Sequence, residues 1–148
     1  MFIVAILAGL TVATIPSFTR SADLDQETRR LELLFAMALT EARLDSIEYG
    51  FRITKTGYLF LQYDDGSQTW VKASAPFHER IIPEGLSLKL KADDGDFKAL
   101  GDNLPPVLIL SSGETTPFEL RIESKDLSDS VTLHTEGYGL IERLIDDQ

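Results

Sequence analysis

The side chains that could carry acid–base, nucleophilic or metal chemistry are scattered through this sequence instead of forming a motif. It has two histidines, no cysteine, and 24 aspartates and glutamates. His78 falls in a predicted loop and His134 on the solvent-facing parity of a predicted strand, so we expect both at the surface. No nucleophile elbow, phosphate loop or histidine-rich metal spacing occurs. We therefore expect no enzyme activity, no catalytic residue, no cofactor and no metal ligand.

Two other features allow a binding interpretation. The acidic run Asp93-Asp94-Gly95-Asp96 has the oxygen atoms that Ca²⁺ prefers, but it lacks the spacing of the twelve-residue calcium loop and its bidentate glutamate. We interpret the segment from Ala92 to Asn103 as a solvated loop. Trp70 has no other aromatic cluster near it in the sequence, which favours an anchor in the core or at its rim over ligand stacking.

The charge is uneven along the chain. The formal net charge is −10, and every ionisable side chain lies at or after Arg20. This acidity weighs against sequence-independent nucleic-acid binding, which needs clustered lysine and arginine. The absence of cysteine excludes disulfides and thiolate metal sites.

The N-terminal third of the chain contains a long helical segment, which would position the rest of the domain. Met1 to Phe18 is uncharged and apolar on every helical face, as expected for a segment in lipid or inside a helix bundle. Eighteen residues span roughly 27 Å as a helix, slightly less than a bilayer core. No basic region precedes the apolar run and no good cut site follows it, so we expect it to remain uncleaved. We predict a membrane-spanning and filament-core helix over residues 1–19, with these contributing residues: Phe2, Ile3, Val4, Ile6, Leu7, Gly9, Leu10, Val12, Ile15 and Pro16.

Pro16 has two interpretations within this helical run. It removes a backbone donor and clashes with the preceding turn, so it could kink the helix, with Gly9 as a second weak point. Alternatively, it could begin a new helix at the first turn, where the missing donor costs nothing.

From residue 20 to about 47 the pattern predicts an amphipathic helix with one apolar stripe. Asp25, Glu27 and Arg30, with other charged residues, are expected on its wet side. The residues expected to pack against a sheet are Leu24, Leu31, Leu34, Phe35, Ala38, Leu39 and Ala42.

Residues 48–148 predict seven or eight short strands in two packed antiparallel sheets. Expected strands cover residues 49–54, 58–63, 69–72, 86–91, 107–110, 117–122, 131–134 and 138–145, the first two as a hairpin and 107–110 as a central strand. The last segment also fits a helical turn, but Gly137 and Gly139 favour a strand. The fold class is α+β: a long helix packed on two antiparallel sheets.

The apolar segment begins with the run Met1-Phe2-Ile3-Val4-Ala5-Ile6-Leu7-Ala8-Gly9-Leu10 and continues to Pro16 and Phe18. This segment resembles the N-terminal helix of type IV pilins and type II secretion pseudopilins. Aligning Pro16 with the proline of that helix places Met1 inside it, so we expect the family's leader, cleavage site and glutamate upstream. The resemblance implies an N-terminus on the cytoplasmic side of the bacterial inner membrane and a globular domain in the periplasm. The positive-inside rule does not decide this, because only one flank of the apolar segment is visible.

Later motifs narrow the resemblance to the H-type minor pseudopilins of type II secretion. They are the helix end Leu39-Thr40-Glu41-Ala42-Arg43, the segment Gly57 to Phe60, the segment Ser112 to Leu120, and the late Gly137-Tyr138-Gly139. The resemblance implies a subunit near the tip of a periplasmic filament. Its expected partners are other minor pseudopilins, the major pseudopilin and the inner membrane.

Two alternatives stay open at this point: a minor pilin of a type IV pilus, for pilus assembly or DNA uptake, and a membrane-tethered β-domain with a small-ligand pocket or an unrecognised catalytic site. The ligand-binding alternative predicts a concave apolar pocket. Filament assembly instead predicts exposed apolar surface on the helix, near Leu24 and Leu31, and no deep pocket.

Overall fold

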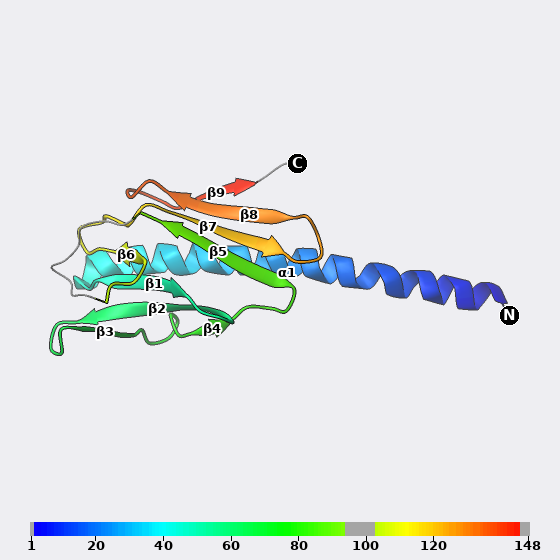
Figure 1. Ribbon diagram of the computed structural model, residues 1–148, viewed down its shortest axis with the longest axis horizontal. Helices are drawn as coiled ribbons and strands as arrows, with labels where there is room; N and C mark the ends of the chain where they lie inside the picture. Colours follow the sequence, from blue (N-terminus) through cyan, green and yellow to red (C-terminus); the bar gives the residue numbers. More distant parts are fainter. Residues whose placement is uncertain (1, 94–102, 146–148) are drawn as a thin grey trace.

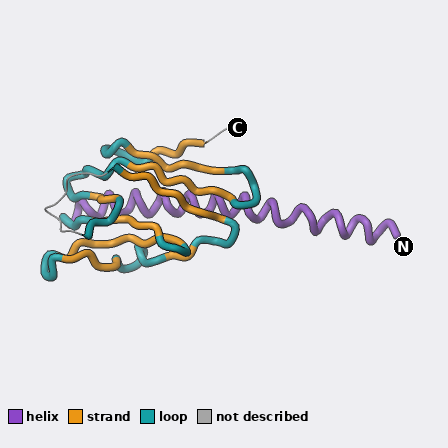
Figure 2. Tube along the Cα trace, viewed as in Figure 1, coloured by secondary structure: helices purple, strands orange, loops and turns teal. Residues whose placement is uncertain are grey.

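The computed structural model describes the backbone of residues 2–93 and 103–145 and the side chains of residues 21–93 and 103–144. One helix, α1 (Phe2–Asp45), carries two antiparallel sheets along its C-terminal half, while its N-terminal part projects away from them (Figure 1). The strands run roughly along the helix, with the connecting loops at the two ends of the domain (Figure 2). The predicted α+β architecture, a long helix packed on two antiparallel sheets, is confirmed.

The first sheet contains β1 (Tyr49–Ile53), β2 (Gly57–Asp64), β3 (Thr69–Lys72), β4 (Arg80–Ile81) and β6 (Val107–Ile109). Its order is β3-β2-β1-β6, and β4 pairs with the start of β2. The predicted hairpin is confirmed by the antiparallel β1–β2 pair, in which Phe51 lies opposite Phe60. Strand β4 was not predicted, because two residues are too short to show a periodicity.

The second sheet has the order β5-β7-β8-β9, formed by β5 (Leu86–Ala92), β7 (Phe118–Ser124), β8 (Ser130–Thr135) and β9 (Glu142–Ile145). Leu120 on β7 lies between Leu90 and Leu133 on the neighbouring strands. The last strand begins at Glu142, not at Tyr138. Gly137 and Gly139 have φ angles of 106° and 81°, so the chain turns before β9 begins.

The prediction of a central strand at residues 107–110 is wrong, because β6 lies at the edge of its sheet. Its residues are nevertheless buried. The following connection covers the free edge: Leu108 N donates to Thr116 Oγ1, and Thr116 N donates to the Leu108 carbonyl, each at 2.9 Å. The apolar residues of β6 are therefore covered by the following loop and by α1, instead of by a strand on each side.

Phe35 of α1 joins the two sheets in one core. Its ring centroid lies 4.8 Å from that of Phe51 and 5.3 Å from that of Phe60 in the first sheet. On the other side it stacks on Phe118 of β7 at 5.1 Å. Such aromatic pairs add stabilisation beyond the burial of their area.

The other sequence-based interpretations have mixed outcomes. Helix α1 continues through Pro16, so the interpretation of that residue as the start of a new helix is wrong. Trp70 is half-buried beside Tyr63, with ring centroids 5.4 Å apart, as expected for an anchor at the rim of the core. Most of the acidic loop, residues 94–102, lies outside the described residues.

Candidate assembly surface

The face of α1 that packs against the sheets is almost completely buried. The seven residues predicted to pack there are at most 7% exposed: Leu24, Leu31, Leu34, Phe35, Ala38, Leu39 and Ala42. Their spacing places them on one side of the helix, and both sheets cover that side. This packing fixes which face of α1 remains available to another molecule.

Glu27 belongs to this buried face, and its predicted position on the wet side is wrong. The side chain is 1% exposed. The Tyr58 hydroxyl donates to Glu27 Oε1 at 2.7 Å, and Arg30 Nη1 donates to Oε2 at 2.7 Å. A buried carboxylate is tolerated only with such partners. Burial and the adjacent Glu27 carboxylate raise the pKa of the Tyr58 phenol well above its ordinary value.

Two further polar contacts fasten the sides of α1 to the sheets. Arg143 on β9 donates to Asp25 Oδ1 at 3.0 Å, and the Tyr49 hydroxyl on β1 donates to Glu41 Oε2 at 3.1 Å. Burial and the Glu41 carboxylate raise the pKa of the Tyr49 phenol to about 12. Together these contacts fix the rotation of α1 about its own axis.

The opposite face of α1 carries an uncharged stripe that the described part of the chain leaves mostly uncovered, with only Met37 packed against the core. It consists of Leu33, Ala36, Met37, Thr40 and Leu44, which we call the outer stripe. Leu33 is 61% exposed and Leu44 is 76% exposed. The Thr40 hydroxyl donates to the Ala36 carbonyl at 2.8 Å, so this polar group is already satisfied within the helix. A shallow groove crosses the stripe at Ala36, Met37, Thr40 and Glu41.

The expected exposure near Leu24 and Leu31 is therefore wrong, since these residues are 5% and 0% exposed. They lie under the sheets, and the exposed apolar residues of the helix lie on its other side. The sequence contained the signal: Leu33, Met37, Thr40 and Leu44 follow helical spacing and include no charge. It was missed because the opposite stripe is longer and more apolar.

The residues predicted for the membrane and filament core, from Phe2 to Pro16, form the projecting part of α1. Among the residues described, no helix combines the length and apolarity required to cross a membrane.

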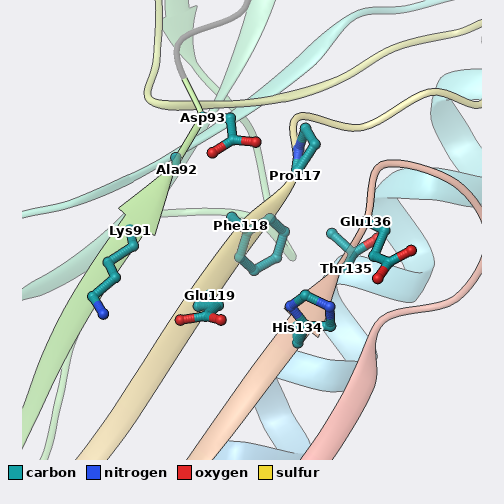
Figure 3. A pocket seen from close by; sticks show the side chains of 9 residues that line it. All are labelled: Lys91, Ala92, Asp93, Pro117, Phe118, Glu119, His134, Thr135 and Glu136. Atoms are coloured by element: carbon teal, nitrogen blue, oxygen red, sulfur yellow. The ribbon is translucent and has the colours of Figure 1, made fainter.

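One hollow on the second sheet has a histidine in its lining. It has a volume of about 460 Å³ and lies at the ends of β5, β7 and β8 (Figure 3). Lys91, Glu119 and His134 line it together with the apolar residues Ala92, Pro117 and Phe118. Among the described residues His134 Nδ1 has no hydrogen-bond partner, so none of them orients it as a catalytic base. Within the described residues, no group of three or more histidines and carboxylates could hold a metal ion.

The positions of the two histidines agree with the predictions in part. His78 is exposed in a loop, whereas His134 is half-buried on the outer face of the second sheet. Tyr138 was named from the sequence only as part of the Gly137-Tyr138-Gly139 motif, and the exposure of Tyr138 and Leu140 in the β8–β9 connection was not predicted. Their flanking glycines could have indicated a projecting turn.

Comparisons with known proteins agree on one relationship. No family model matches the chain. It is 31% identical over 151 residues to type II secretion system protein H of Pseudomonas aeruginosa, a match that covers 95% of this chain and 87% of the relative. The fold is similar to that of the minor pseudopilin EpsH from the type 2 secretion system of Vibrio cholerae, with a TM-score of 0.70, 23% identity, and coverage of 85% of this chain and 99% of that one. The solution structure of E. coli GspH is also similar, with a TM-score of 0.61, 21% identity, and coverage of 86% and 89%.

Proposed function

This chain belongs to the family of type II secretion system protein H, and from that premise we propose that it is a minor pseudopilin, a structural subunit near the tip of a periplasmic secretion filament. The observation that carries the proposal is the outer stripe of α1. An apolar helix face that its own domain leaves uncovered is suited to pack against another helix. Leu33 and Leu44, both largely exposed, lie eleven residues apart on this stripe, about three helical turns.

Residues 1–19 form the second part of the proposed assembly module. The uncharged segment from Met1 to Phe18 would span the inner membrane before assembly, with the N-terminus in the cytoplasm. On assembly it would move into a bundle of similar helices. Both environments are apolar, so packing against helices replaces packing against lipid at little cost. Residues 20–148, the amphipathic helix to about 47 and the β-domain after it, would remain in the periplasm.

The proposed partners are the other minor pseudopilins and the major pseudopilin. Nucleic acid is not among them, because the net charge of −10 opposes binding to a polyanion. The comparisons do not favour the type IV pilus alternative. The hollow beside His134 has a mixed apolar and charged lining, and no described residue bonds His134 Nδ1 to orient it as a base, so it gives little support to catalysis.

A charge placed on the outer stripe tests the proposal. Leu33→Glu and Leu44→Glu alter exposed positions and should leave the fold intact. Buried in a filament, each unpaired carboxylate would be strongly unfavourable. We expect incorporation into the filament and secretion of exported protein to fall about tenfold or more.

Ser21→Glu is the matched control, because it adds the same charge to an exposed position of the same helix about 120° around the axis from Leu33, off the outer stripe. Normal protein levels should accompany all three variants. Full incorporation of Leu33→Glu and Leu44→Glu would refute the proposed role of this face.

A further inference from the structure

The β8–β9 connection displays two large apolar side chains to solvent. Tyr138 is 74% exposed and Leu140 is 78% exposed. They alternate with Gly137 and Gly139, whose positive φ angles create a projecting turn. Tyrosine is enriched among the anchors of protein interfaces, and the exposed leucine beside it enlarges the apolar surface that a partner can bury.

The turn is held in place despite its exposure. Thr115 N donates to the Gly137 carbonyl at 2.9 Å, and Gly137 N donates to Thr135 Oγ1 at 3.2 Å. The Tyr138 hydroxyl donates to Glu114 Oε1 at 3.2 Å. A surface that is already ordered loses little conformational entropy when a partner binds.

The charges around the turn are mainly acidic. Glu114, Glu136 and Glu142 are exposed beside it, no lysine or arginine occurs between Glu136 and Glu142, and one cation, Arg43 of α1, lies against Gly113. The next cation, Arg143, is bonded to Asp25 of α1. This rim is complementary to a basic surface. It disfavours a second copy of this chain, since two copies would place like charges together.

The turn also lies at the end of the domain opposite the projecting part of α1 (Figure 1). With that helix in the membrane or filament core, the turn would point away from the membrane. We propose that Tyr138 and Leu140 dock in an apolar hollow with a basic rim on a different pseudopilin of the same filament. This inference rests on the proposed function and adds a second contact surface, separate from the outer stripe.

Site-directed cross-linking can test the contact, because the chain contains no cysteine. Full-length Leu140→Cys, labelled with a benzophenone maleimide, would be irradiated in membranes that contain each of the other pseudopilins of the same system in turn. The control is Ile81→Cys, an apolar position that is 77% exposed on the other sheet. We expect one pseudopilin to be cross-linked from position 140 and not from position 81. Tyr138→Ala should weaken that association about 30-fold, as for an interface hot spot.

Three outcomes would overturn the inference: equal cross-linking from both positions, cross-linking only to a second copy of this chain, or an unchanged affinity in Tyr138→Ala. Filament incorporation of Leu140→Cys is measured in the same cells. Normal incorporation without a specific cross-link refutes this surface and leaves the proposed function standing. Failure of the unsubstituted chain to enter a filament refutes both.

Discussion

The bond between Tyr58 and Glu27 should be one of the most sensitive points of the fold. Tyr58 is completely buried and Glu27 is 1% exposed, so neither group can replace its partner with bulk water. Tyr58→Phe removes the donor and leaves the Glu27 carboxylate with Arg30 as its described partner. Loss of a hydrogen bond to a buried charged group costs about 1.5–3 kcal/mol. We expect the free energy of unfolding of Tyr58→Phe to fall by this amount.

The matched control is Tyr138→Phe, which removes the same hydroxyl from an exposed tyrosine–glutamate bond. It should change stability little, because water can solvate the remaining carboxylate. Urea unfolding of the full-length chain in detergent, followed by the fluorescence of Trp70, measures both variants.

A double-mutant cycle with Glu27→Met separates the bond from general packing. Glu27→Met leaves the Tyr58 hydroxyl buried without an acceptor, at a cost of about 1–3 kcal/mol. In the double variant neither polar group remains, so its loss should be clearly smaller than the sum of the two single losses. Additive losses, or a loss in Tyr58→Phe no larger than that in Tyr138→Phe, would refute the assigned role of this pair.

Three further variants test other parts of the structure. The folded state holds the Tyr49 proton more tightly than the unfolded state, with a pKa of about 12 against an ordinary value of about 10, so the contribution of Tyr49 to the free energy of unfolding should be constant below pH about 10 and be lost as pH rises from about 10 to about 12; Tyr49→Phe should reduce the alkaline loss of stability, to which Tyr58 also contributes, and an unchanged slope would contradict the assignment. Gly57→Ala places a Cβ 1.8 Å from the Arg80 carbonyl oxygen and should destabilise the chain by about 1–3 kcal/mol, whereas Gly66→Ala, whose nearest contact is 3.6 Å, should unfold like the wild type. Leu10→Glu places a charge in the proposed membrane and filament-core segment and should abolish filament incorporation, and unchanged secretion by this variant would count against that role.

The sequence predicted most of the fold because local periodicity follows burial. The alternation of apolar and polar residues in residues 86–91 and 117–122 matches strands β5 and β7, and the stripe from Leu24 to Ala42 matches the dry face of α1. Periodicity does not show which element covers a run. Strand β6 was therefore predicted at the centre of a sheet, although a loop and the helix bury it at the edge.

The functional surfaces were harder to predict, since they depend on contacts distant in sequence. Glu27 has the spacing of a core residue, four positions before Leu31, but its charge indicated the wet face. Its partner, Tyr58, is 31 residues away and could not be identified from the sequence. Leu33 and Leu44 look like ordinary helix residues until the sheets are placed on the opposite face.

The most direct test is whether assembly covers the outer stripe of α1. Leu33→Cys in this cysteine-free chain should react rapidly with a bulky maleimide before assembly, because position 33 is 61% exposed. Ser67→Cys, in the exposed β2–β3 turn, serves as the control. We expect protection of position 33 by at least about tenfold in isolated filaments, with position 67 unchanged. Equal reactivity of position 33 before and after assembly would contradict the account.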